Sequence, residues 1–376
     1  MRRKTWIAFF IGLMCFVMML IGYHAYLRYS TSVEMKTFEQ PSPPIKRILP
    51  PITRKTIKIL SINGGGIRGI LPLSMLAYIE RHTGKPISES FDFIVATSSG
   101  SITATLLSMP NQEGKPKYNI DQIIQLYLLQ GQKIFHVPWY HRLLTLGGLL
   151  GPKFVNQPRI HLVKKLYGQT RFDQLLTNVM IPIYNVSLGK PMIYQNWYVP
   201  EQYDYNYLVS GVVLGAISTP IAFSDAIIGR TNAQTLMDGG IFATNPAMLG
   251  LIFAMANYPS HRYLLVSLGT GLHTPKTTVV SQDNWGLLQW EVNLLPVILD
   301  SEIRFQHLLI CKLQKAFPGQ IQYYDFNHEI DFFASEAAIL TPKQLQETKA
   351  EGRAFVRDKQ QQLDQLIKQL KALDSE

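Results

Sequence analysis

Ser98 is the first of three features whose residue types and surroundings suit nucleophilic catalysis. It lies in Ala96-Thr97-Ser98-Ser99-Gly100, directly after an apolar run. A serine at a tight turn between a strand and a helix projects above the sheet, and small residues two positions before and after it permit the bend. The N-terminus of the following helix favours a developing negative charge. The segment predicts a nucleophile at Ser98, with Gly100 permitting the turn, although similar sequences also occur in ordinary turns.

The second feature is the glycine-rich segment 64–69, which follows a β-rich run at 57–62. Three consecutive glycines leave their N–H groups free to point at one oxygen, which is the arrangement of an oxyanion hole. The predicted donors are the amides of Gly64, Gly65 and Gly66. Arg68 and Gly69 end the segment and are expected to support the site, Arg68 by bracing the loop or by binding a phosphate headgroup.

The same glycine-rich segment also matches the pattern G-x-G-x-x-G of dinucleotide-binding proteins. That alternative requires an acidic residue at the end of the next strand, where it would bind the ribose. The next apolar run ends in Thr97-Ser98-Ser99 instead. We therefore favour the oxyanion hole over a nucleotide site.

The third feature is Met237-Asp238-Gly239-Gly240, a carboxylate at the predicted end of a strand. An Asp-Gly pair on its own usually marks only a turn. Gly239 and Gly240 would let this turn approach another loop closely. Together with the other two features, this turn predicts Asp238 as the general base for Ser98.

The regions around these features indicate alternating strands and helices. Strand, glycine-rich turn and helix occur twice in succession, which is typical of an α/β domain with a parallel sheet. The expected strands are 57–62, 91–97, 180–186, 235–237 and 263–268. The expected helices cover 71–79, begin at 102, and form a C-terminal element from about 341 that turns toward the body Leu363, Leu366, Ile367 and Leu370.

In this order and context, the three features resemble those of the patatin-like phospholipase family, from about residue 58 to about residue 271. Further matches are Ser218-Thr219-Pro220, Asn245-Pro246-Ala247 and the segment 265–271. The resemblance implies a three-layer α/β/α patatin-like fold with a mostly parallel central sheet. It also implies a Ser98–Asp238 dyad without a histidine, and hydrolysis of acyl esters in phospholipids or neutral lipids. Nothing in the sequence requires a cofactor.

The sequence departs from the family pattern at two positions. Asn63 stands where an aspartate often begins the glycine-rich loop, and Ala96 replaces the first glycine of the serine motif. If the Ala96 methyl group closed the turn, the protein would be a catalytically impaired lipid-binding or scaffold protein. A third possibility is an α/β-hydrolase-type esterase with a Ser-His-Asp triad. The histidines that follow Asp238 are His261, His273, His307 and His328, and none lies in a recognisable motif.

The N-terminal residues 6–27 are almost wholly apolar and long enough to span a bilayer. We expect 1–29 to be an uncleaved membrane anchor rather than a signal peptide, because no small-x-small cleavage site follows. Basic residues at positions 2–4 predict a cytoplasmic N-terminus and a catalytic domain on the non-cytoplasmic side. Residues 30–56 are rich in proline and are expected to form a linker. The predicted hydrolase domain is 57–376.

The net charge is +10, yet only 16% of the residues are charged and no long basic block or nucleic-acid motif is present. A basic surface facing anionic membrane lipids is one interpretation, and a soluble basic protein is the other. Cys15 and Cys311 suit neither a disulfide nor a metal site. The expected partners are an acyl-lipid substrate and a membrane surface, with no obligate protein partner indicated.

The segment 134–155 combines many large apolar residues with glycines and contains no acidic residue. Such a segment suits a lid or a membrane-dipping surface over a lipid site. A core helix with its loop is the alternative, and the sequence leaves both open.

Overall fold

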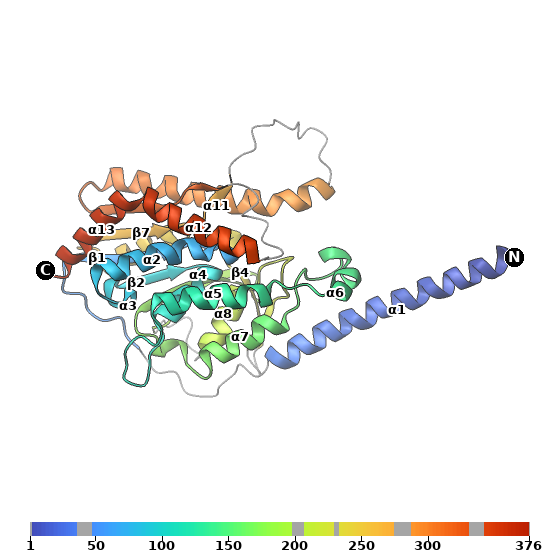
Figure 1. The fold of residues 1–376 in the computed structure, drawn as a ribbon. Helices are drawn as coiled ribbons and strands as arrows, with labels where there is room; N and C mark the ends of the chain where they lie inside the picture. The colour runs from blue at the N-terminus through green and yellow to red at the C-terminus, as the bar shows by residue number, and fades with distance from the viewer. Residues whose placement is uncertain are drawn as a thin grey trace.

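The computed structural model describes residues 2–35, 47–197, 207–228, 233–273, 287–330 and 342–375. In these ranges a mixed β-sheet lies between two layers of helices, and a long N-terminal helix projects from the body (Figure 1). The predicted three-layer α/β/α fold is confirmed.

The central sheet has the strand order β5-β6-β3-β2-β1-β7-β9, with β4 also paired to β3. Its strands are β1 (Thr56–Ile62), β2 (Phe93–Ala96), β3 (Asn178–Asn185), β4 (Lys190–Gln195), β5 (Ala226–Ile228), β6 (Gln234–Asp238), β7 (Arg262–Leu268) and β9 (Ile321–Phe326). The pairs that join β3, β2, β1, β7 and β9 are parallel, and the pairs that involve β4, β5 and β6 are antiparallel. Strands β1 and β2 are buried throughout, as expected for parallel strands covered on both faces.

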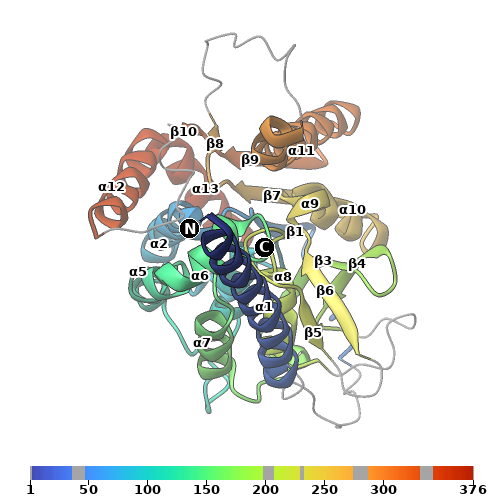
Figure 2. The same cartoon turned by 90° about the vertical axis from the view of Figure 1, so that its right-hand side faces the viewer.

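Two hydrophobic clusters, one on each face, hold the sheet between its helices. The larger layer contains α2 (Ile70–Thr83), α4 (Ser99–Leu107), α5 (Ile120–Ile134), α7 (Gln157–Tyr167), α8 (Val209–Ala216), α12 (Pro342–Asp358) and α13 (Gln360–Leu373). The opposite layer contains α9 (Gly240–Ala243), α10 (Ala247–Asn257) and α11 (Leu287–Ala316), as Figure 2 shows. Shorter elements are α3 (Ile87–Ser90), α6 (Trp139–Leu144), the 3-10 turns η2 (Gly66–Gly69), η3 (Leu146–Gly148) and η4 (Phe172–Gln174), and the small β8–β10 pair (Leu272–His273 with Glu329–Ile330).

The five expected strands are all present, with small differences at their ends. β2 stops at Ala96 rather than 97, because the chain leaves the sheet there to make the turn that carries Ser98. The helix expected from 102 already begins at Ser99, since Ser98 is its N-cap. The expected C-terminal helix is two helices, α12 and α13, separated at Lys359. The α13 residues predicted to face the body are buried.

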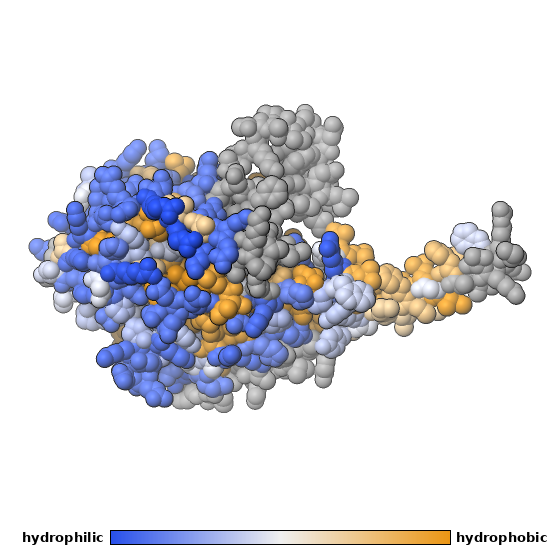
Figure 3. Space-filling model, in the orientation of Figure 1, coloured by the Kyte–Doolittle hydropathy of each residue, from blue (hydrophilic) through white to orange (hydrophobic). Residues whose placement is uncertain are grey.

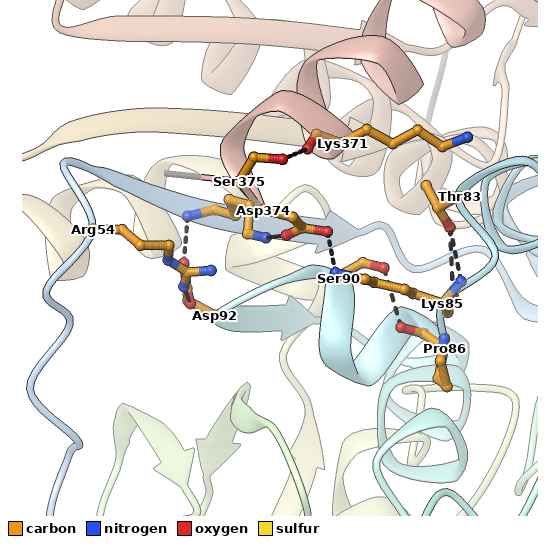
Figure 4. Close-up of polar contacts among 10 residues, drawn as sticks. Arg54, Thr83, Lys85, Pro86, Ser90, Asp92, Lys371, Asp374 and Ser375 are labelled. Carbon is orange, nitrogen blue, oxygen red and sulfur yellow. Dashed lines mark hydrogen bonds and ion pairs between the residues drawn. The ribbon is translucent and has the colours of Figure 1, made fainter.

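Charged side chains hold the C-terminus at the amino-terminal ends of the parallel strands. Asp374 accepts hydrogen bonds from Lys58 Nζ at 2.6 Å and from Lys85 Nζ at 2.7 Å. Burial alone would raise the pKa of the Asp374 carboxyl, but these two lysines lower it below its ordinary value. Arg54 pairs with Asp92 nearby (Figure 4). These contacts lie away from the three predicted catalytic features and serve to hold the fold.

The N-terminal helix α1 covers Arg2–Met35, and its stretch Phe9–Leu27 is long and apolar enough to cross a membrane. A signal sequence satisfies the same criterion. Residues 30–35 are helical although we expected linker there, because no proline or glycine occurs between positions 23 and 40. The linker residues 36–46 lie outside the described part of the chain.

Candidate active site

The direction of two strands brings Ser98 and Asp238 together. β2 pairs with residues 178–180 of β3, and β6 pairs with residues 183–185 of the same strand. β4 pairs with residues 180–185, so it occupies the other edge of β3. Because β2 is parallel to β3 and β6 is antiparallel to it, β2 and β6 end facing each other. Ser98 follows the end of β2, and Asp238 is the last residue of β6.

The glycine-rich loop reaches the same place from β1. Ile62, the last residue of β1, lies opposite Ala96, so the loop begins beside the Ser98 turn. Thr270, just after β7, donates from Oγ1 to the Gly64 carbonyl at 2.6 Å and holds the loop from its other side. The site therefore lies at the carboxyl ends of the parallel strands, where α/β sheets generally bind ligands.

Ser98 has a strained backbone, with φ 53° and ψ −127°. Positive φ is uncommon for a residue with a Cβ, and a serine in this strained turn presents its hydroxyl above the sheet. Gly100 is required for the turn, because a Cβ there would lie 2.6 Å from the Ile62 carbonyl oxygen. Ala96 packs its methyl group in the hydrophobic core below the turn. The departure from glycine at position 96 therefore leaves the turn intact.

Asp238 is 2% exposed and contacts Ser98 directly. Its Oδ2 accepts from Ser98 Oγ at 2.6 Å and from Thr219 Oγ1 at 2.7 Å, and its Oδ1 accepts from the Gly240 amide at 2.8 Å. Burial raises the pKa of the Asp238 carboxyl and outweighs these hydrogen bonds and the Arg159 charge, which lower it. A carboxylate in this position can accept the Ser98 proton without an intermediary.

The amides of the glycine-rich loop differ in their availability. The Gly64 N–H donates to the Thr244 carbonyl at 3.0 Å. Gly64 was predicted as an oxyanion donor, but its hydrogen is already engaged, so we do not assign it that role. Within the described ranges, the amides of Gly65 and Gly66 have no acceptor in a backbone or side-chain hydrogen bond. Gly66 has φ +58°, which aims its amide differently from that of a helical residue.

Replacing Gly66 by valine is expected to lower kcat about 10²–10³-fold, which is typical for the loss of one oxyanion donor. A β-branched residue is strained at φ +58°, so the loop would move and redirect its amides. The measurement is kcat on a soluble short-chain ester, with circular dichroism to verify folding. A folded variant with wild-type kcat would assign the loop another role.

The remaining predicted supporting residues lie around this centre. Arg68 braces the loop through long hydrogen bonds of 3.5 Å to the Gly65 and Gly271 carbonyls, which favours bracing over headgroup binding. Gly69 packs against the ring of Tyr127, so a Cβ at this position would meet the ring at 2.8 Å. The third residue, Gly239, lies against the backbone of β3 and lets the Asp238 turn approach it.

A cavity of about 780 Å³ is bordered by Ser98, Asp238 and the glycine-rich loop. This volume is within the usual range for small-molecule sites, about 300–1,000 Å³. Its walls are largely apolar and come from α5, α7 and the loop 217–223; among them are Leu126, Ile134, Phe135, Leu162, Leu166 and Phe223. An apolar cavity with few convergent polar groups at one place suits an acyl chain with a single reactive ester.

Arg159, on α7, borders the cavity and was not predicted from the sequence. It is fully buried, and its Nη1 donates to Ile217 O at 3.0 Å and to Ser218 Oγ at 3.1 Å. Its Nη2 donates to Ser224 O at 2.5 Å. Arg159 therefore fastens both ends of the loop that carries Thr219, the second hydroxyl donor to Asp238. Arg159 lies in a helix with several other basic residues and no recognisable motif, so the sequence does not distinguish it from them.

Arg159→Lys is expected to lower kcat/KM on a soluble ester about tenfold or more. Burial lowers the pKa of Arg159 to about 9, partly offset by Asp225 and Asp238, so the side chain stays charged at neutral pH. Lysine keeps the charge but loses the planar fork that serves three acceptors. Each hydrogen bond to a charged group contributes about 1.5–3 kcal/mol. Unchanged kcat/KM in the folded variant would remove Arg159 from the account as a positioning residue.

The histidines considered for a triad lie elsewhere. His261 contacts Ile52 O at 3.1 Å, His307 pairs with Asp325 at 2.8 Å, and His328 stacks on Phe355. The backbone of His273 belongs to β8, and its side chain lies outside the described residues. No histidine borders the cavity in the part of the chain that the structure describes. The same part holds no cluster of three or more side chains suited to a metal ion.

Comparisons with a family model and with relatives of similar sequence give a consistent assignment. A family model described as patatin-like phospholipase matches residues 60–251, which include all three predicted catalytic features. Patatin-like protein 2 of Arabidopsis thaliana is 29% identical over 292 residues, covering 69% of this chain and 71% of that protein. Patatin-like protein 1 of the same plant is 27% identical over 315 residues, with 74% and 76% covered. Among solved structures, VipD from Legionella pneumophila matches with a TM-score of 0.35 and 14% identity, covering 92% of this chain and 73% of that chain.

Proposed function

Because this chain belongs to the patatin-like phospholipase family, we propose that it hydrolyses acyl esters of phospholipids or lysophospholipids as a serine hydrolase. Ser98 is the nucleophile and Asp238 is its general base. The observation that carries the proposal is the 2.6 Å contact between Ser98 Oγ and Asp238 Oδ2 at the border of a largely apolar cavity.

The chemistry follows from the positions of these groups. Ser98 Oγ attacks the ester carbonyl carbon while Asp238 takes its proton, and the amides of Gly65 and Gly66 stabilise the negative charge on the carbonyl oxygen. Protonated Asp238 then donates to the leaving alcohol. Water, deprotonated by Asp238, attacks the acyl-enzyme, and Asp238 returns that proton to Ser98 Oγ as the fatty acid is released. Thr219 and Gly240 keep the carboxylate oriented throughout.

The experiment is a lipid assay with identified products. Purified full-length protein is mixed with diacyl phospholipid, lysophospholipid or triacylglycerol in detergent, and the released fatty acid and remaining lipid are measured by mass spectrometry. We expect fatty acid release from at least one phospholipid class by wild type and none by Ser98→Ala. A folded wild-type protein that binds these lipids but cleaves none would instead be a lipid-binding or scaffold protein.

The position of α1 is also proposed, as an uncleaved membrane anchor with the catalytic domain on the non-cytoplasmic side. The fit of its end to the body supports retention: Leu27 is 5% exposed, and Gly151 accommodates the His24 ring, which a Cβ would meet at 2.7 Å. Basic residues at positions 2–4 favour a cytoplasmic N-terminus. The intact mass of protein extracted from membranes would reveal removal of α1 directly, and protease digestion of intact cells would reveal the orientation.

A further inference from the structure

The segment between α5 and α7 exposes a group of large apolar side chains, here called the apolar rim. It consists of Trp139, Tyr140, Leu143, Leu146, Leu149 and Leu150, which are 44–78% exposed. Figure 3 shows hydrophobic surface at the base of α1, over α6. A group of exposed large apolar side chains this close together in the sequence indicates an interaction surface. Of the two interpretations that the sequence leaves open, the exposure of these residues favours a surface element over core.

The rim borders the mouth of the cavity. Gly147, Gly148 and Leu149 line the cavity, and Leu149 is at the same time 64% exposed. After the apolar rim the chain reaches the loop 217–223 of the cavity wall, where the Lys153 amide donates to the Ile221 carbonyl at 2.9 Å. Ile221 likewise lines the cavity and is 53% exposed. A ligand bound on the rim therefore has an apolar path to Ser98.

The same segment is fastened to α1. The Tyr23 hydroxyl and His141 Nδ1 are 2.7 Å apart, and His141 Nε2 lies 2.9 Å from the Pro152 carbonyl oxygen. That carbonyl can only accept, so Nε2 carries the hydrogen, and Nδ1 of the neutral ring accepts from Tyr23. Burial lowers the pKa of His141, which favours the neutral ring. The rings of Tyr23 and Tyr140 also meet edge to face at 6.5 Å.

This attachment determines where the rim lies when α1 spans a membrane. Tyr23 is within the apolar stretch Phe9–Leu27, four positions before its end. At 1.5 Å per residue, Tyr23 then lies about 6 Å inside the end of the span. The side chains that contact Tyr23 are therefore held at the boundary between headgroups and acyl chains. Trp139 and Tyr140 are residue types that favour this boundary.

The charge of the surrounding sequence fits an anionic lipid surface. Residues 122–172 contain no Asp or Glu and seven Lys or Arg, of which Arg159 is buried and Arg171 pairs with Asp173. Lys133, which precedes the rim in sequence, and Arg142, which lies within it, are both exposed. Basic residues near an anionic membrane each contribute about 1 kcal/mol to binding.

We propose that the apolar rim inserts into the bilayer that holds α1, and that the cavity takes its lipid directly from that bilayer. The proposal rests on the proposed hydrolase function and adds the source of the substrate: lipids of the leaflet next to the C-terminal end of the α1 span. The bilayer is the favoured occupant because the rim is continuous with α1 and its surroundings are basic.

The test compares full-length proteins reconstituted into vesicles of phosphatidylcholine with and without phosphatidylserine. The rim variant is Trp139→Ser/Leu143→Ser/Leu150→Ser, whose residues do not line the cavity. The matched control, Ile252→Ser/Phe305→Ser/Leu308→Ser, changes exposed apolar residues on the opposite helical layer. Each protein is assayed on vesicle lipid and on a water-soluble short-chain ester.

We expect the rim variant to lose about tenfold or more of vesicle hydrolysis, because insertion of apolar side chains stabilises the bound state. Its hydrolysis of the soluble ester should remain within about twofold of wild type, and the control should keep both rates. If the wild-type protein hydrolyses neither the vesicle lipid nor the soluble ester, the hydrolase function itself is refuted. If the folded rim variant hydrolyses vesicle lipid at the wild-type rate, the proposal is overturned. The same holds if that variant also changes oligomeric state, since the rim would then be an interface between copies.

A second measurement does not depend on activity or on the folding of a triple variant. Two proteins are compared, Trp6→Phe and Trp6→Phe/Trp139→Phe. Vesicles whose lipids are brominated in the acyl chains should quench part of the tryptophan fluorescence of the first protein. That quenched part should be absent from the second protein. Loss of this component identifies Trp139 as inserted. Equal quenching in both proteins would place Trp139 outside the bilayer and contradict the proposal.

Discussion

Ser98→Ala is expected to abolish ester hydrolysis, lowering kcat by about 10⁴-fold or more, as is usual for loss of a nucleophile. Without Oγ no acyl-enzyme can form. The residual rate would come from substrate binding and the amides of Gly65 and Gly66. The measurement is kcat on a soluble ester and on phospholipid in detergent.

The fold should survive this substitution. Alanine tolerates the same backbone conformation as serine, and Asp238 keeps its bonds to Thr219 and Gly240. A thermal midpoint near that of wild type is the control. A folded Ser98→Ala protein that still turns over the ester would show that another residue attacks the carbonyl.

Asp238→Asn should be as severe as Ser98→Ala, because in a dyad the carboxylate itself takes the proton. The amide of asparagine is close in shape but cannot act as a base. kcat/KM of wild type should fall as the pH drops through the pKa of Asp238, since only the ionised carboxylate accepts the Ser98 proton. Burial raises that pKa, so the loss should begin above the ordinary range of an aspartate, about pH 4.

The matched controls for the dyad are His261→Ala, His273→Ala, His307→Ala and His328→Ala, tested one at a time. Each should keep most of the wild-type kcat. In a Ser-His-Asp triad, loss of the histidine lowers the rate by several orders of magnitude. One folded histidine variant as inactive as Ser98→Ala would replace the dyad by a triad.

The central features of the site were predictable because each lies within one short segment. A glycine-rich turn, a serine between small residues and an Asp-Gly-Gly turn each follow a strand, and parallel strands bring their carboxyl ends to one edge. The strands were likewise predictable from apolar runs bounded by turns. Strands β4, β5 and β9 were not predicted, since the apolar run of β5 is only three residues long and β4 and β9 mix polar with apolar residues.

What the sequence did not reveal depends on contacts between distant segments. The end-to-end meeting of β2 and β6 requires the pairings of β3 to be known. The Gly64 amide is engaged by Thr244, a residue far away in sequence, so three adjacent glycines did not indicate which amides remain available. Arg159 likewise acts through carbonyl groups of a remote loop. Every residue has a backbone carbonyl, so the sequence does not show which carbonyls accept these hydrogen bonds.

The most direct test of the central claim is covalent labelling of the full-length protein with a fluorophosphonate, followed by mass spectrometry of its peptides. Such a probe reacts with an activated serine and needs no knowledge of the natural lipid. We predict one adduct, on Ser98, that is lost in Ser98→Ala, strongly reduced in Asp238→Asn and retained in the four histidine variants. A folded wild-type protein that stays unlabelled, or carries the adduct on another residue, would contradict the assignment of Ser98 and Asp238.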